Sequence, residues 1–289
     1  MFVGTARRDG VSPQGKAHFV LAGSRFFVGW GMSKTIVLVH GAWLTGLAWE
    51  KFKTRFEERG YSVHTPSWPF DDRPVPELQK SPNPDLAHLG VKAIVDHYEA
   101  YIRTLPESPI IMGHSFGGLF TQVLLDRGLG VAGVAISPGA PRGILVAPRT
   151  LISALPIFLA WKGWSRTLTM TFEQFRTNFA NKLPSSEQLA AFERYIVPTP
   201  GRIYFEGAVG IGTKVDWQNP KRAPLLLTGA EFDRIVANSM VEQNFRAQSK
   251  NPNKTDYHFF PGRSHFLCGE PGWEEVADFC LDWAEKNQR

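Results

Sequence analysis

The chain has 289 residues, of which 43% are apolar and 20% are charged. This balance supports a large hydrophobic core and excludes global disorder. The net charge of +5 is concentrated before Met32, and later charges of both signs alternate, so the composition does not indicate a nucleic-acid partner. Two cysteines, Cys268 and Cys280, are too few for a disulfide framework, and no Cys/His cluster has zinc-ligand spacing.

Residues 1–31 are predicted to form a loosely ordered N-terminal extension. They contain arginines and an apolar patch, but no clean signal-peptide core followed by a cleavage site. A weak transit peptide, a β-hairpin, and a leader upstream of a second start at Met32 are the alternatives for this segment. No apolar run reaches the roughly 18–20 residues of a membrane span. We therefore expect a cytoplasmic protein without stable membrane insertion.

From Lys34 onward, short apolar runs alternate with patterns of helical period. Continuous runs of this kind are typical of strands buried on both faces of a parallel sheet. Strands are predicted at 35–39, 61–65, 109–112, 131–136, 224–228 and 256–260, and helices at 49–59, 86–105, 115–127, 239–248 and 273–286. This alternation predicts an α/β fold with a mostly parallel sheet and helices on both faces.

The alternation lapses between residues 140 and 219. This stretch is rich in Leu, Phe and Trp at helical spacing and has no strand runs. We interpret it as an inserted helical cap, which leaves residues 32–139 and 220–289 as the catalytic core.

The most specific local motif is Gly113-His114-Ser115-Phe116-Gly117. A predicted strand runs into this motif and a predicted helix follows it. Such a strand-to-helix turn crowds its neighbouring Cβ atoms, and glycines at both ends relieve that crowding. The turn would expose the Ser115 hydroxyl at the sheet edge, in front of the helix N-terminus. Ser115 is therefore the candidate nucleophile, although a hydroxyl needs a positioned base to act as one.

With this motif the chain resembles the α/β-hydrolase superfamily, whose members place nucleophile, acid and histidine in that order along the chain. The resemblance runs from about Met32 to the C-terminus, apart from the cap. It implies that Asp233, which follows the strand at 224–228, is the acid, and that His265, which follows the strand at 256–260, is the base. Glu231 is a competing acid. His40 and His114 are expected to make structural hydrogen bonds.

The resemblance also extends to His40-Gly41-Ala42-Trp43, which looks like the oxyanion turn of the family. It implies that the backbone N–H groups of Ala42 and Phe116 stabilise the negative charge of a tetrahedral intermediate. For the substrate pocket we expect Trp43 together with the cap residues Phe158, Trp161 and Trp164, whose apolar area suits a hydrophobic acyl or alcohol group.

These residues predict a serine hydrolase that cleaves carboxylic esters or lactones through an acyl-enzyme. The expected partner is a small ester-like molecule, with no metal, no organic cofactor and no nucleic acid, and the protein is expected to be a monomer or homodimer. The His40–Trp43 turn also looks like those of plant methyl esterases and hydroxynitrile lyases. Lyase chemistry with Lys162 as the extra basic group, perhydrolase chemistry, and a small-molecule receptor are the alternatives.

Overall fold

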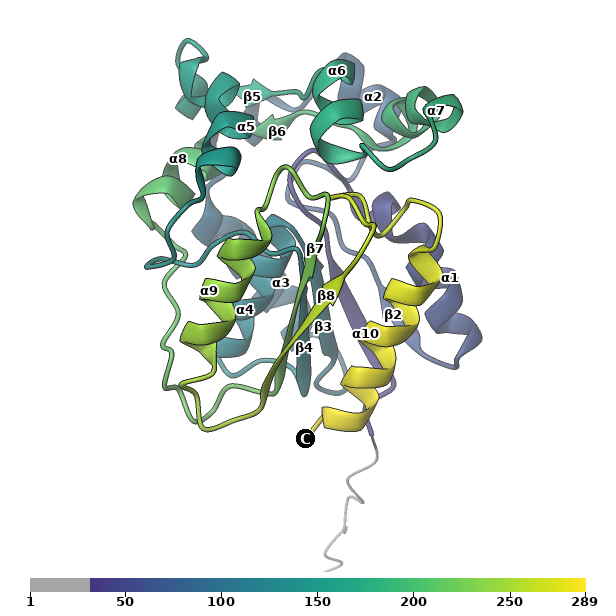
Figure 1. Cartoon of the computed structure of the whole chain (residues 1–289), viewed down its shortest axis with the longest axis vertical. Helices are drawn as coiled ribbons and strands as arrows, with labels where there is room; N and C mark the ends of the chain where they lie inside the picture. The colour runs from purple at the N-terminus through teal and green to yellow at the C-terminus, as the bar shows by residue number, and fades with distance from the viewer. Residues whose placement is uncertain (1–31) are drawn as a thin grey trace, which may run out of the picture. The chain divides into compact units, whose positions relative to one another are not determined.

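Six parallel strands form the central sheet of the computed structural model, which describes residues 32–289 (Figure 1). Their spatial order is β2-β1-β3-β4-β7-β8, and each neighbouring pair is parallel. The strands span β1 Thr35–Val39, β2 Ser62–His64, β3 Ile110–His114, β4 Ala132–Ile136, β7 Leu225–Ala230 and β8 Thr255–Phe260. The predicted α/β fold with a mostly parallel sheet is confirmed. The predicted N-terminal extension lies outside the described residues.

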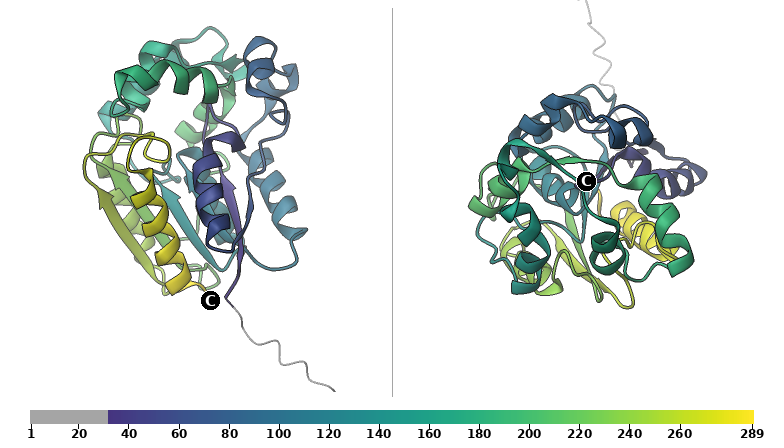
Figure 2. Two further views of the ribbon diagram at one scale, coloured as in Figure 1. Left: turned by 90° about the vertical axis from the view of Figure 1, so that its right-hand side faces the viewer. Right: turned by 90° about the horizontal axis from the view of Figure 1, so that it is seen from above.

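Helices cover both faces of this sheet because alternate strand residues point in opposite directions. In β1, Ile36 and Leu38 pack in one cluster with α1 (Glu50–Glu58) and α10 (Trp273–Asn287). Val37 and Val39 pack on the other face with α3 (Val91–Arg103) and α4 (Phe116–Asp126). A fifth helix that packs on the sheet, α9 (Asn238–Gln248), lies beside α4 (Figures 1 and 2).

A second layer lies beyond the carboxyl ends of the strands and contains the residues predicted as the cap (Figure 1). Within 140–219 its elements are α5 Pro148–Leu159, η3 Gly163–Ser165, β5 Thr167–Leu168, α6 Phe172–Gln174, η4 Phe175–Phe179, α7 Ser185–Tyr195, β6 Thr199–Pro200 and α8 Arg202–Val209. The strands β5 and β6 pair antiparallel, whereas the sequence predicted no strand here. Each is only two residues long, too short for an alternating pattern to show.

Two further elements from the N-terminal half join this layer. The short helix α2 (Val75–Lys80) contacts α7, and η2 (Pro84–His88) contacts both β5 and β6. The connection between β2 and α3 therefore packs against the elements of residues 140–219. The remaining short helix, η1 (Gly46–Trp49), precedes α1.

Candidate active site

Ser115 sits at the sharp turn between β3 and α4, with φ 57° and ψ −122°. A non-glycine residue at such positive φ is strained, and strain of this kind concentrates at functional sites. The flanking glycines are required by contact: a Cβ on Gly113 would lie 2.1 Å from the Gly117 carbonyl oxygen, and one on Gly117 would lie 2.0 Å from the Val39 carbonyl oxygen. The turn therefore holds Ser115 at the carboxyl end of the sheet, where it lines a pocket.

Asp233 and His265 form a buried pair on the loops that follow β7 and β8. His265 Nδ1 lies 2.7 Å from Asp233 Oδ2, and neither side chain is accessible to solvent. The other carboxylate oxygen, Oδ1, accepts the backbone N–H groups of Ile235 and Val236, each at 2.8 Å. Because a carboxylate can only accept, Nδ1 carries the proton and Nε2 is left as the free acceptor of the ring.

The acceptor atom Nε2 of His265 is buried and has no hydrogen-bond partner within residues 32–289. No hydrogen bond joins it to the Ser115 hydroxyl. The two residues are nevertheless brought close together, since His265 packs at a ring-centroid distance of 4.5 Å on His114, the neighbour of Ser115 in the chain. In unliganded enzymes the bond between nucleophile and base is often long and tightens only with substrate.

His114 supports the backbone of His265. Its Nε2–H donates to the His265 carbonyl oxygen at 2.8 Å. Burial is the main cause that holds the pKa of His114 well below its ordinary value, and the adjacent His265 lowers it further, so this ring is neutral. The expected structural role of His114 agrees with this geometry.

Sequence reasoning missed Glu270, a buried carboxylate on the same loop. It accepts the Ser264 backbone N–H at 2.9 Å and also binds the Ser264 hydroxyl. Burial raises the pKa of Glu270. Its bonds brace the residue directly before His265, a role for which the sequence carries no signal beyond a nearby carboxylate.

The turn after β1 packs directly on Ser115. A Cβ on Gly41 would lie 2.8 Å from the Ser115 Cβ and 2.9 Å from the His114 carbonyl oxygen. The backbone N–H groups of Ala42 and Phe116 donate to no acceptor in the described part of the chain. Phe116 is also the first residue of α4, where helix N–H groups have no partner within the helix.

His40 fixes the peptide that carries the Ala42 N–H. The Trp68 backbone N–H donates to His40 Nε2 at 3.2 Å, so Nδ1 bears the proton and donates to the Gly41 carbonyl at 2.9 Å. The Gly41 carbonyl and the Ala42 N–H belong to one planar peptide unit and point in opposite directions. Burial lowers the pKa of His40 to about 4, so the ring stays a neutral donor.

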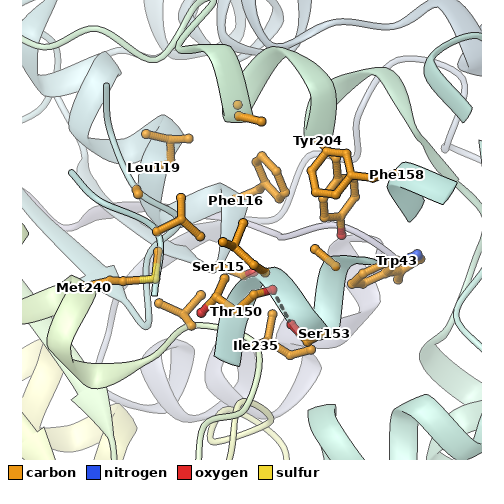
Figure 3. Close-up of a pocket in the computed structure, with 18 residues that line it drawn as sticks. Trp43, Ser115, Phe116, Leu119, Thr150, Ser153, Phe158, Tyr204, Ile235 and Met240 are labelled. Atoms are coloured by element: carbon orange, nitrogen blue, oxygen red, sulfur yellow. Dashed lines mark hydrogen bonds between the residues drawn. The ribbon is translucent and has the colours of Figure 1, made fainter. Parts of the chain in front are cut away.

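The pocket in front of Ser115 has an empty volume of about 820 Å³, including its open mouth (Figure 3). Among residues 32–289 no charged side chain lines it. Its polar side-chain groups are Ser, Thr and Tyr hydroxyls and the indole N–H of Trp43. One of the hydroxyls, that of Ser153, already donates to the Thr150 carbonyl at 2.8 Å (Figure 3). A smaller neighbouring cavity shares Trp43, Ser153 and Ile235 with it. An apolar ligand group therefore suits the main pocket.

Two of the four predicted pocket residues line this space and two do not. Trp43 and Phe158 do, whereas Trp161 and Trp164 are 78% and 56% exposed. The reason is that α5 ends at Leu159 and the chain turns through Lys162, which has φ 55°, so both tryptophans lie past the helix face that meets the pocket. Tyr204 also lines the pocket but was not predicted. Its ring packs on those of Trp43 and Phe116, at ring-centroid distances of 5.2 and 5.0 Å.

Other sequence predictions concern groups outside this centre. The competing acid Glu231 is exposed and accepts the Gly262 backbone N–H at 2.8 Å. Lys162 is exposed and does not line the pocket. Cys268 and Cys280 are free and buried. Among residues 32–289, no group of three His, Cys, Asp or Glu side chains could hold a metal ion. No helix in this range is long and apolar enough to cross a membrane.

Residues 36–279 match the family described as the alpha/beta hydrolase family, which is most of the chain. The protein belongs to the alpha/beta hydrolase family. The match includes the turn after β1, Ser115, Asp233 and His265. This membership supports a hydrolase. No curated protein matches the chain.

Solved structures of this family are similar over nearly their whole length. A monoacylglycerol lipase from Paleococcus ferrophilus has a TM-score of 0.67 at 19% identity, covering 89% of this chain and 97% of that chain. Tomato methylketone synthase I complexed with 2-tridecanone has a TM-score of 0.67 at 17% identity, covering 89% and 100%. A pyrethroid hydrolase from Sphingobium faniae JZ-2 has a TM-score of 0.63 at 20% identity, covering 88% and 98%. Likenesses at this identity show the fold alone.

Proposed function

We propose that this protein is a serine hydrolase that cleaves carboxylic esters or lactones through an acyl-enzyme. The observation that carries the proposal is the buried His265–Asp233 pair, whose Nε2 acceptor is unpartnered beside the turn that bears Ser115. An imidazole with its proton fixed on Nδ1 is in the tautomer that a general base requires. Family membership and neighbours titled lipase, esterase and hydrolase support the same class.

The mechanism follows from these positions. Rotation of the Ser115 side chain brings its hydroxyl to His265 Nε2, which takes the proton as the oxygen attacks the acyl carbon. Asp233 stabilises the imidazolium that forms. The Ala42 and Phe116 N–H groups receive the negative charge on the former carbonyl oxygen. His265 then protonates the leaving alcohol, and water activated by the same ring releases the acid and restores Ser115.

The lining of the main pocket indicates the substrate class. Leu119, Phe158, Ile235 and Met240 surround a space without any charged side chain. A hydrophobic acyl or alcohol group would release ordered water there, whereas a charged group would lose its hydration without compensation. We therefore expect turnover of p-nitrophenyl esters to increase with acyl length until the pocket is filled.

Covalent labelling tests the nucleophile. A fluorophosphonate probe should label the wild-type protein, and Ser115→Ala should remove both the labelling and ester hydrolysis. Ser153→Ala is the matched control, because its hydroxyl lines the same pocket but already donates to Thr150. Labelling that persists in Ser115→Ala would overturn the assignment. Absence of labelling in the wild type, with tight retention of an unmodified small molecule, would favour a receptor.

A further inference from the structure

The outer face of α5 is apolar and uncovered. Ile152, Leu155 and Leu159 recur at helical spacing and are 71%, 48% and 74% exposed. Leu151 on the same helix is exposed as well, and exposed apolar side chains continue before and after the helix in the sequence, at Leu145, Trp161 and Trp164. We call these seven residues the α5 surface. Leu47, Leu189 and Phe259 are also exposed but lie far apart in the sequence.

This helix is apolar on its inner face as well. Ile157 is buried, and Ala154 and Phe158 line the substrate pocket. A helix on the outside of a globular protein normally carries polar residues on the face that meets water. A contiguous exposed apolar face is typical of a site that binds another protein or a membrane.

The charged side chains of residues 140–171 have one sign. Arg142, Arg149, Lys162 and Arg166 are exposed, and none forms an ion pair within residues 32–289. No acidic residue occurs between 128 and 172. A second copy docked through the same face would bring like charges together. A partner with a negatively charged surface would bind the exposed cations, and its apolar interior would accept the exposed apolar side chains.

We propose that the α5 surface docks reversibly on an anionic lipid bilayer. Its leucines and isoleucine would enter the interfacial region, its tryptophans would lie at the headgroup level, and the four cations would contact lipid phosphates. With 12 residues, α5 is about 18 Å long, so it lies in the interface and does not cross the roughly 30 Å hydrocarbon core.

Docking here would connect the membrane with the pocket. Leu151 is 49% exposed and also lines the pocket, as do Thr150 and Phe158 on the same helix. An apolar molecule dissolved in the bilayer would thus meet the pocket mouth without passing through bulk water. The docking itself does not require Ser115 and is independent of the proposed ester hydrolysis.

Vesicle flotation with the full-length protein tests the proposal. The wild type should float with phosphatidylcholine vesicles that contain about 30% phosphatidylglycerol, and less with pure phosphatidylcholine. About 0.5 M NaCl should weaken the binding, because the ionic contribution is screened. Ser115→Ala should bind as the wild type does, which separates this result from any failure of the proposed enzyme activity.

Two variants and a matched control locate the contact. The triple variant Ile152→Ser, Leu155→Ser, Leu159→Ser should lower the partition coefficient at least about tenfold, and Arg149→Glu with Lys162→Glu should lower it on anionic vesicles only. Leu189→Ser, which removes a 52% exposed leucine on α7, should bind normally. Circular dichroism and turnover of a soluble ester check folding, because none of these side chains lines the pocket.

Three results would overturn the proposal. The first is a wild-type protein that does not bind anionic vesicles, and the second is a triple variant that binds them as well as the wild type does. A wild-type dimer that the triple variant converts to a monomer, without vesicle binding by either, would assign the α5 surface to a second copy of the chain.

Discussion

Replacing Asp233 by Asn tests the proposed base most directly, because the geometry determines how the amide must orient. In the wild type, Oδ1 accepts two backbone N–H groups at 2.8 Å, from Ile235 and Val236, while Oδ2 faces His265 Nδ1 at 2.7 Å. In Asp233→Asn the amide oxygen must stay with the backbone N–H groups of Ile235 and Val236, because the opposite orientation would place the amide NH₂ against these two donors. The amide NH₂ then faces His265.

The expected consequence is a change of tautomer. Facing an amide donor, Nδ1 of His265 must become the acceptor, so its proton moves to Nε2. A protonated Nε2 cannot accept the Ser115 proton. The side chain has nearly the same volume, so packing around this buried site is preserved and folding should be little affected.

The loss is expected to be about 10⁴-fold in kcat, the effect of holding the wrong tautomer in an analogous triad. This corresponds to about 5.5 kcal/mol of transition-state stabilisation. KM for a p-nitrophenyl ester should change little, because Asp233 does not line the pocket. Initial rates and the rate of fluorophosphonate labelling both measure the effect.

Glu231→Gln is the matched control, since Glu231 lies two residues before Asp233 but is exposed, and within residues 32–289 its carboxylate accepts only the Gly262 backbone N–H. Its activity should stay within about threefold of the wild type. If Asp233→Asn retains activity within tenfold, or if Glu231→Gln loses as much, the assignment of the acid is wrong. Thermal unfolding of both variants shows whether a loss reflects chemistry or folding.

Three further perturbations have expected outcomes. Gly117→Ala should destabilise the protein by about 2–4 kcal/mol in urea unfolding and abolish labelling, because its Cβ would lie 2.0 Å from the backbone oxygen of Val39; wild-type stability would contradict this. His40→Ala should lower kcat about 10- to 100-fold and leave KM unchanged, because the hydrogen bond that holds the Gly41 peptide is lost; a change confined to KM would contradict it. Burial, and next a neighbouring acid, raise the pKa of Asp71 to about 7. The folded state therefore retains a proton on Asp71 that the unfolded chain releases above pH 3.8, so the contribution of Asp71 to stability falls as pH rises from about 4 through 7. Asp71→Asn should be more stable by about 2–4 kcal/mol at pH 8 and gain little at pH 4; a pH-independent difference in urea unfolding would refute this.

The core of the fold was predictable because its signals are local. The run from Thr35 to Val39 is apolar throughout, and the observed strand has the predicted bounds. The last helix was expected at 273–286 and spans Trp273–Asn287, since its apolar face and terminal charges follow the helical period. The motif at Ser115 and the order of acid and histidine in the family together predicted Asp233 and His265, each of which follows a strand, and parallel strands end at one edge of the sheet.

The lining of the pocket could not be predicted in the same way. Helical spacing shows that residues such as Phe158 and Trp161 belong to an apolar stretch, but not which face of it meets the pocket. That choice depends on where α5 ends and on the packing of α8 against it. The bond between His114 and His265 joins residues 151 positions apart, and only the folded chain brings them together.

The hydrogen bonds of His40, His114 and His265 show that only His265 is arranged to act as a base. His40 and His114 each donate a ring N–H to a backbone carbonyl, and burial keeps both neutral. Within residues 32–289 neither ring is hydrogen-bonded to a carboxylate, whereas His265 has Asp233 at 2.7 Å. The charge that develops in the proposed reaction is therefore confined to the one ring that a buried carboxylate stabilises. The two neutral rings hold the backbone of Gly41 and of His265 without competing for the Ser115 proton.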